Sequence, residues 1–337
     1  MGIIANVGAL ATMTEPVNSG IVAQFIELLF SWIGNYGWTV VVFTLMLKLV
    51  LSPLDFWQKH VMHKNMRAMD RLKPQMEKLQ KQYAGNKQRF QQEQMKLYKK
   101  EGYSMWGACL PMIITIVVFF FVFSQFNGMA TYMVKRDIYE MEKVYETTIE
   151  QEENSGKTHD KAVSIAQDKV ADWYESEGKD SFLWIKNVFM PDNWSNSIPT
   201  YQDIIGTLRI PASEINEGTY TSMTAKLRLK PENQGWNGLL ILPVLTIAVS
   251  FLTQLVTKQQ TPQSMAGDAT TQKSQGIMMK VLMPVMMGMF ALFYSTAFTI
   301  YMFVSQLFSF LFQIAYNFIV GMRDKKEDDY KLTHTYK

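Results

Sequence analysis

The sequence predicts an all-α integral membrane protein with five transmembrane helices, its N-terminus outside and its C-terminus inside the cell. Five segments are apolar enough to enter a bilayer, and most charged residues lie in the blocks between them. The block after the first apolar segment is strongly basic and the block after the second is acidic. By the positive-inside rule, the basic block is cytoplasmic. We therefore expect a cytoplasmic helical hairpin and an extended extracytoplasmic insert.

Ten segments follow from this pattern, with Gly, Pro and charged residues marking their boundaries. In order they are an N-terminal lead with an interfacial amphipathic helix (1–35), the first span (36–54), the basic hairpin (55–104), the second span (105–131), the acidic insert with an interfacial segment (132–237), the third span (238–257), a cytoplasmic loop (258–276), the fourth span (277–294), the fifth span (297–320) and a cytoplasmic tail (321–337).

Residues 21–33 predict a short amphipathic helix that lies in the membrane interface. Apolar side chains recur there at helical spacing, but the segment is too short to cross a bilayer. The alternative is one long first span that begins near Ile21, and Gly34 and Gly37 favour a break instead. The fifteen residues at the N-terminus contain no Lys or Arg, so we interpret them as a short lead or as the remnant of a processed start.

The first span contains one full charge, Lys48, about two thirds of the way across from the outside. A charge inside a span is costly and usually faces a partner or a water-filled cavity. One interpretation is that Lys48 snorkels to the inner interface, since Pro53 lies five residues on and is expected to end the span. The other is that Lys48 is a cation in a wet groove between helices.

Polar residues in the other spans favour the groove. No carboxylate partner for Lys48 is evident within the spans, so we expect water or a transient ligand there. Any one of these residues alone is better explained by helix–helix hydrogen bonding. Taken together, the predicted substrate groove consists of Lys48, Thr44, Thr115, Gln125, Ser250, Gln254, Ser305, Gln306 and Ser309.

The basic block carries twelve Lys or Arg residues against five Asp or Glu residues, a net charge of +7. Its apolar residues repeat at helical spacing from Met62 to Tyr83 and again from Phe90 to Tyr98, with a turn at 84–86 between the two stripes. Pro74 is expected to kink or break the first helix. These charges are either simply solvated or bind a partner at the cytoplasmic side. The candidates for such a recruitment surface are Arg67, Arg71, Lys73, Lys78 and Lys81.

The acidic insert carries twelve basic and eighteen acidic residues between positions 132 and 236, a net charge of −6. Residues 137–151 and 160–177 predict two amphipathic helices separated by a turn at 154–156. Residues 182–194 are rich in aromatic side chains, as an interfacial segment would be. The turn-rich stretch 195–236 is expected to hold short strands.

Enzyme chemistry is not predicted, and neither a cofactor nor a catalytic residue is expected. His60 and His63 lack a nearby set of carboxylate ligands, so no metal site is predicted. Cys109 is the single cysteine, which excludes an intrachain disulfide, and it has no clear base partner.

Several motifs together resemble the YidC/Oxa membrane protein insertases, in the form with a short N-terminus that is common in Gram-positive bacteria. They are GWTVVVFTLMLKLVLSPLDFWQKH at 37–60, the Met-rich basic hairpin, GACLPMIITIVVFF at 107–120 and FLWI with PD between 182 and 192. The resemblance implies a multi-pass, monomeric protein of the bacterial plasma membrane that inserts nascent membrane proteins and assists their folding. Its implied partners are membrane lipids, the ribosome, the signal recognition machinery and the Sec translocon.

The sequence departs from the family pattern in three places. The family generally has Arg where this chain has Lys48, which keeps the charge but loses the bidentate guanidinium. The outer block 132–181 is longer than the family's usual connection, and the tail is not strongly basic. The alternative function is a small-solute transporter or channel that uses the same cavity. It predicts inverted repeats or broken spans, and none is evident in the sequence.

Overall fold

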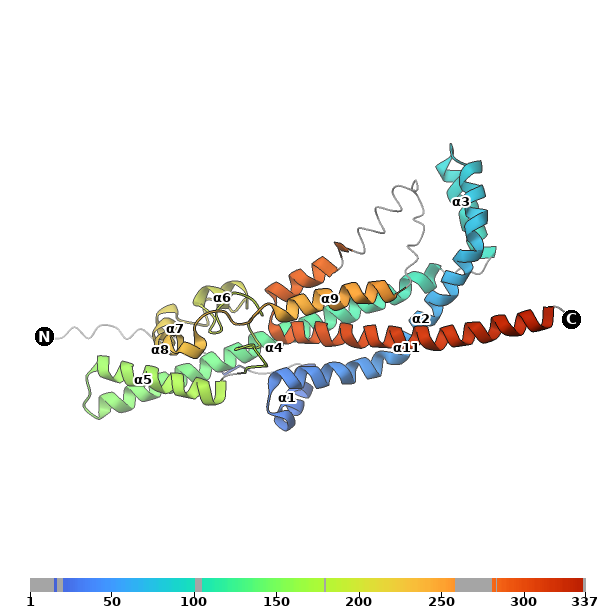
Figure 1. Ribbon diagram of the computed structural model, residues 1–337. Helices are drawn as coiled ribbons and strands as arrows, with labels where there is room; N and C mark the ends of the chain where they lie inside the picture. The colour runs from blue at the N-terminus through green and yellow to red at the C-terminus, as the bar shows by residue number, and fades with distance from the viewer. Residues whose placement is uncertain are drawn as a thin grey trace. The chain divides into compact units, whose positions relative to one another are not determined.

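Helices make up nearly all of the regular structure in the computed structural model (Figure 1). It describes residues 15–16, 21–100, 105–178, 180–257, 281–282 and 284–335. Predictions for the N-terminal lead, for the loop 258–276 and for the start of the fourth span lie outside the described residues, as does the prediction for the Cys109 side chain. The short strands expected in 195–236 are absent from the described residues. That stretch folds into short helices instead, with isolated bridges at Phe182–Ile185 and Asn196–Trp236.

Among the described residues, three helices contain a stretch long and apolar enough to cross a membrane, and they cover Tyr36–Ala68, Ile113–Asn154 and Thr296–Arg323. They belong to α2 (Tyr36–Gln82), α4 (Met105–Asn154) and α11 (Thr296–Thr335). Shorter apolar helices are Val22–Ile33, Pro284–Phe293 and Ile241–Val256, the last of which is α9. The part of the chain that the structure describes is therefore helical and suited to a membrane, whereas the count of five spans remains a prediction.

Helix α2 does not end at Pro53, where the sequence predicted the end of the first span. It runs for 47 residues through both Pro53 and Pro74. At 1.5 Å per residue it is about 70 Å long, more than twice the thickness of a hydrocarbon core. A proline removes one backbone hydrogen bond and can kink a helix without ending it. One helix thus supplies both the predicted span and the first arm of the hairpin.

Helix α4 likewise joins two elements that the sequence predicted separately. It contains the second apolar segment and the amphipathic stretch 137–151 in one helix of 50 residues. It ends at Asn154, and Gly156 follows with a φ of 82°, which only glycine adopts without strain. The predicted turn at 154–156 therefore lies where the chain reverses into α5 (His159–Trp173).

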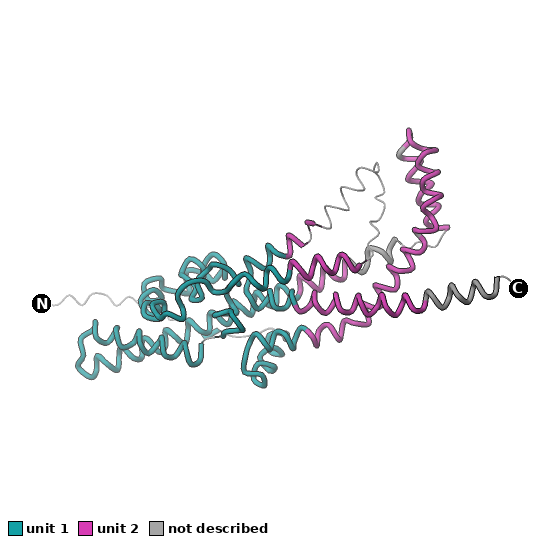
Figure 2. Tube along the Cα trace, in the orientation of Figure 1, with its two compact units in different colours: residues 1–44, 122–246, 288–303 teal, residues 45–121, 247–287, 304–337 magenta. Residues whose placement is uncertain are grey.

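The chain divides into two compact units (Figure 2). The first consists of Met1–Thr44, Val122–Thr246 and Gly288–Phe303, and the second of Leu45–Phe121, Ile247–Met287 and Val304–Lys337. Each unit is thus assembled from three stretches of chain, and α2, α4, α9 and α11 contribute residues to both.

In the first unit, a glycine separates α1 (Ile21–Ile33) from α2. Gly34 has a φ of 72°, and its N–H donates to the Phe30 carbonyl, which ends α1 in a left-handed cap. The Asn35 side chain then accepts a hydrogen bond from the Trp38 N–H (3.1 Å) and caps α2. The alternative of a single long span from Ile21 is therefore not what the chain forms.

The aromatic segment 182–194 is largely buried in protein. A Cβ at Gly37 would lie 2.2 Å from the Phe182 ring, so the start of α2 requires glycine to receive this segment. Tyr36 packs edge-on against Phe189, with ring centroids 4.8 Å apart. Of the segment's aromatic residues, Trp194 remains 55% exposed. The interfacial position of the segment remains a prediction.

Buried asparagines hold this segment in place. Asn237 accepts from the Asn187 N–H and donates to the carbonyls of Asn187 and Pro191, each at 2.9 Å. The Asn187 amide in turn donates to the Ser197 carbonyl at 2.9 Å and its oxygen accepts from the Phe189 N–H. Both asparagines are nearly inaccessible to solvent, so these bonds are made in surroundings where unpaired groups would be costly.

Asp192 caps α9 from a distant part of the sequence. Its fully buried carboxylate accepts from the N–H groups of Leu240 (3.0 Å) and Leu242 (2.9 Å) at the start of that helix. A Cβ at Gly238 would lie 1.9 Å from the Asp192 Oδ1. The start of α9 is therefore fixed by this carboxylate and by the absence of a side chain at Gly238.

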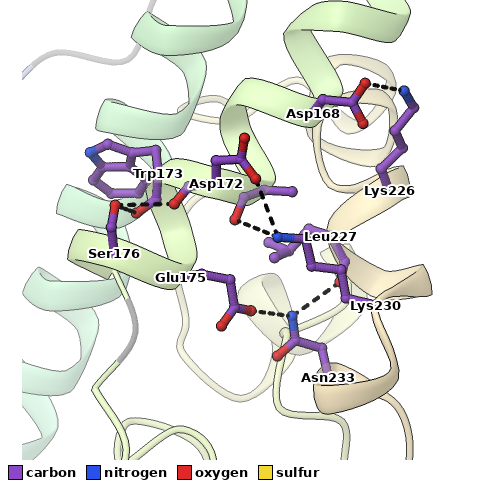
Figure 3. A network of polar contacts seen from close by, with 10 residues as sticks. Asp168, Asp172, Trp173, Glu175, Ser176, Lys226, Leu227, Lys230 and Asn233 are labelled. Carbon is purple, nitrogen blue, oxygen red and sulfur yellow. Dashed lines mark hydrogen bonds and ion pairs between the residues drawn. The ribbon is translucent and has the colours of Figure 1, made fainter.

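The remaining helices of the first unit are η1 (Tyr174–Gly178), α6 (Tyr201–Gly206), α7 (Glu217–Met223), α8 (Ala225–Leu229) and η2 (Pro231–Asn233). Polar contacts join α5 and η1 to α8 and η2 (Figure 3). Lys226 pairs with Asp168 at 2.7 Å, Lys230 pairs with Asp172 at 3.5 Å, and the Asn233 amide donates to Glu175 at 2.9 Å. Small residues of α5, such as Ala162 and Ala166, are buried and allow close packing.

Candidate functional site

The amine of Lys48 meets a second helix on a polar face of the second unit. Its Nζ donates to the Ser309 Oγ of α11 at 3.2 Å, and the Lys48 side chain is 16% exposed. Both residues belong to the predicted groove, and the structure brings them together. A buried amine needs such acceptors, because an unsolvated cation is costly in an apolar environment.

Lys48 does have a carboxylate nearby, contrary to the sequence prediction. The Asp55 Oδ2 lies 4.0 Å from the Lys48 Nζ, and its side chain is 24% exposed. The prediction considered only the spans and ended the first span at residue 54, so it placed Asp55 in the loop. Because α2 continues, Asp55 lies seven residues on along one helix. It is therefore within about 20° of the same face.

Lys59 is a second cation on this face that the sequence analysis counted only as a loop charge. Its Nζ donates to the Gln313 Oε1 of α11 and lies 5.7 Å from the centre of the Phe312 ring. Lys59 follows Lys48 by eleven residues, three helical turns, so it too falls within about 20° of the same face. The spacing of 7 and 4 from Lys48 to Asp55 to Lys59 was the signal that could have revealed this row.

The row continues onto α9 through amide side chains. Gln313 donates to the Asn317 Oδ1 at 2.8 Å, and Asn317 donates to the Val256 carbonyl at 3.0 Å. That carbonyl lies at the end of α9, where the helix has no further N–H group of its own to donate to it. Polar bonds thus connect α2, α11 and α9 within the second unit.

Two amide oxygens of the predicted groove lack partners. The Oε1 atoms of Gln254 on α9 and Gln306 on α11 are buried and make no hydrogen bond in the part of the chain that is described. A buried acceptor without a donor costs about 1–3 kcal/mol. These oxygens are therefore places where water or a passing donor would be stabilised. Ser250 and Ser305 are half-buried on the same two helices.

Thr44, Gln125 and Thr115 are further residues predicted for the groove, and Thr44 lies one helical turn before Lys48 on α2. Thr44 and Gln125 belong to the first unit. The Thr44 hydroxyl is fully buried and donates to the Val40 carbonyl of its own helix at 2.6 Å, so its proton is already used. Thr115 lies in the second unit, but its side chain is exposed on α4.

The hairpin of the second unit has its own small core. Leu72 and Met76 of α2 pack against Tyr98 of α3 (Lys87–Lys100), with Phe90 and Leu97 at the edge. The basic side chains face away from this core. Arg71, Lys73, Lys78 and Lys81 are exposed and Arg67 is half-buried, and Lys73 pairs with Asp70 at 2.7 Å.

The candidate site is therefore a row of charges and amides without metal-binding character. In the described ranges no three His, Cys, Asp or Glu residues come together as metal ligands would. What the arrangement can do is hold an anion or a polar chain at Lys48 and Lys59, and supply acceptors at Gln254 and Gln306.

Part of the chain is similar in sequence to known proteins. The chain is 33% identical to a protein of Helicobacter pylori named membrane protein insertase YidC, over 33% of this chain and 21% of that protein. Proteins of the same name from Wolinella succinogenes and Leptospira interrogans are each 34% identical, over 33% and 34% of this chain and 22% and 18% of theirs. The matched part spans about a fifth of the length of these relatives.

A family comparison covers far more of the chain than the single relatives do. The family described as 60Kd inner membrane protein matches residues 28–323, which include every helix of both units except the ends of α1 and α11. The matched residues also include the whole row from Lys48 to Asn317. The chain belongs to the 60Kd inner membrane protein family.

Proposed function

We propose that this chain is a membrane protein insertase that moves segments of other proteins into the bilayer and assists their folding, without bond chemistry. The observation that carries the proposal is the polar face of the second unit. There the Lys48 amine is bonded to Ser309, and the buried oxygens of Gln254 and Gln306 lack donors. The names of the relatives support this function and give no support to the alternative of a solute transporter.

A polar face within the membrane lowers the free-energy cost of inserting a polar segment, and the mechanism follows from this. Bringing an unpaired backbone amide into hydrocarbon costs several kcal/mol. A polar segment of the substrate that enters this face meets the amine of Lys48 and the free acceptors of Gln254 and Gln306, together with the water they hold. The barrier for moving that segment is lowered accordingly, with no energy source other than binding and partitioning.

Release into lipid requires an apolar surface beside the polar one. Within the second unit, Val117 and Phe120 of α4 and Leu311 and Phe318 of α11 are each more than half exposed. The apolar helix of a substrate gains by contact with such side chains and with lipid tails alike. We expect it to leave the polar face along these helices.

The predicted topology completes the proposal. Five spans would place the acidic insert outside the bacterial plasma membrane and the basic hairpin in the cytoplasm. The exposed Lys73, Lys78 and Lys81 would then face the ribosome, the signal recognition machinery or anionic lipid headgroups. The Sec translocon is a further candidate partner, and the monomer is the proposed working form.

Complementation tests the function. Expression of this chain in a bacterium depleted of its own insertase should restore insertion of single-span substrates, measured by protease protection. A photo-reactive residue at position 48 should crosslink to nascent substrates. The matched control is position 50, where Val50 is 75% exposed on another side of α2 and should contact lipid. Failure of rescue, together with lipid crosslinks alone from position 48, would exclude the proposal.

A further inference from the structure

Asp55 lies between two lysines on the polar face of α2. Its carboxylate is 4.0 Å from the Lys48 amine, and Lys59 follows four residues later on the same helix. Lys59 is held by Gln313 and the Phe312 ring, both on α11. Two cations and one anion leave this row with a net charge of +1.

The pair between Lys48 and Asp55 is loose. Charge-assisted hydrogen bonds between an amine and a carboxylate are normally about 2.7–2.9 Å long. Elsewhere on α2, Lys73 and Asp70 reach 2.7 Å although both are more than half exposed. Lys48 instead directs its hydrogen bond to Ser309 and keeps Asp55 at the outer limit of an ion pair. Asp55 thus lowers the free-energy cost of burying the Lys48 ammonium group, while the hydrogen bond of that group goes to Ser309.

The geometry points to Asp55 as an exchangeable counter-ion that tunes the site for acidic substrate segments, an inference that rests on the proposed function. A carboxylate of the substrate takes the place of Asp55 beside Lys48, and Asp55 stays in the field of Lys59. The row then passes from +1 to neutral. A neutral segment finds Lys48 already compensated and gains no charge interaction. Asp55 therefore weakens the attraction of the site for acidic cargo and keeps the empty site close to neutral.

The test compares single-span substrates that carry zero, one or two Asp residues in the translocated segment, on stalled ribosomes with membrane vesicles. A photo-reactive residue at position 306 reports occupancy in every variant and leaves Lys48 intact. Asp55→Asn should raise crosslinking of the substrate with two Asp by about fivefold, the size expected for one charge pair of intermediate exposure. The neutral substrate should crosslink as before.

Matched variants separate charge from structure. Asp55→Glu keeps the charge and should behave as the unmodified chain does. Asp70→Asn removes the exposed partner of Lys73 on the same helix and should change nothing. Lys48→Ala combined with Asp55→Asn should abolish the gain, because the cation that receives the substrate is gone. Protease resistance of each variant confirms that it is folded, and the second neutral variant Asp55→Gln carries the comparison if Asp55→Asn is not folded.

The outcomes also separate this inference from the proposed function. Equal crosslinking by Asp55→Asn and the unmodified chain, or a loss of acidic substrate, would overturn the role of Asp55 while leaving an insertase in place. An Asp55→Glu variant that differs from the unmodified chain would assign Asp55 a purely structural role. The absence of any substrate crosslink from position 306 in the unmodified chain would instead contradict the insertase itself.

Discussion

The asparagine network of the first unit and the polar row of the second unit use polar side chains in opposite ways. In the first unit, the buried Asn237 side chain is hydrogen-bonded to the Asn187 backbone and the Pro191 carbonyl, and the buried Asn187 amide donates to the Ser197 carbonyl. In the second unit, the oxygens of Gln254 and Gln306 are buried without a donor among the described residues, and the ion pair of Lys48 is loose. A fully satisfied network fixes one structure, whereas an incomplete one leaves room for a ligand. The first is therefore a scaffold and the second a site.

The largest expected effect is a loss of stability when the asparagine network of the first unit is disrupted. Asn237→Ala removes three hydrogen bonds at a fully buried position and leaves the Asn187 N–H unpaired, while the carbonyls of Asn187 and Pro191 each lose one of their two donors. We expect a loss of about 3 kcal/mol in the free energy of unfolding. Denaturant titration in detergent measures it. Asn196→Ala, at an exposed position nine residues after Asn187, is the control and should cost little. Equal stabilities would show that the asparagine network is not what holds this segment.

A second effect in the first unit depends on pH. Burial raises the pKa of Asp180 from its ordinary range to about 6, although nearby Arg136 opposes this shift. The folded state therefore binds a proton more tightly than the unfolded state, so this group's contribution to stability falls as pH rises from about 4 to about 6. We expect a loss of about 2 kcal/mol over that interval. Asp180→Asn should remove this slope from a series of unfolding midpoints, and an unchanged slope would contradict the assignment.

The next effect concerns the site, where function should change more than stability. Lys48→Ala should lower insertion of substrates with acidic translocated segments by about tenfold, which corresponds to ~1.4 kcal/mol. Lys48→Arg should retain it, because the charge is kept. Protease protection of the substrate measures the effect. Equal insertion activity of the unmodified chain, Lys48→Ala and Lys48→Arg would show that the charge at position 48 has no role.

The smallest effect concerns the partly exposed contacts of Figure 3. Asp168→Asn removes the ion pair with Lys226, and Asp168 is 62% exposed. Exposed pairs contribute about 0–1 kcal/mol, and Lys226 keeps its contacts to Ser164. Thermal unfolding should therefore shift only slightly. A loss as large as that of Asn237→Ala would show that surface pairs, rather than buried amides, hold the first unit together.

The sequence predicted local structure better than where helices end. The short helix at 21–33, the turn at 84–86 and the reversal at 154–156 depend on nearby Gly, Asn and apolar spacing, and the structure has helices or turns at these places. The sequence predicted the end of the first span near Pro53 but not that the helix itself continues through this proline to Gln82. The strands predicted in 195–236 were wrong because that stretch is organised by buried side chains from elsewhere, such as Asn187.

The site was partly visible in the sequence. Lys48 is recognisable because a charge in an apolar run is rare, and Ser309 because it is polar in another span. Asp55 and Lys59 were hidden by the assumption that the helix ended between them and Lys48. The bond from Asn317 to α9 could not be predicted, because it joins residues 61 positions apart through a contact that only the fold creates.

The capping of α9 by Asp192 sets an order of assembly. The chain is synthesised from its N-terminus, so Asp192 is made before α9. Its carboxylate later accepts hydrogen bonds from the N–H groups at the start of that helix. Those groups have no partner within the helix, and in a membrane they would otherwise remain unpaired. The third apolar segment can therefore begin its helix at a defined residue only once the preceding loop is in position. Maturation of this protein should accordingly proceed from the loop that carries Asp192 to α9, and this loop then fixes where the later helix begins.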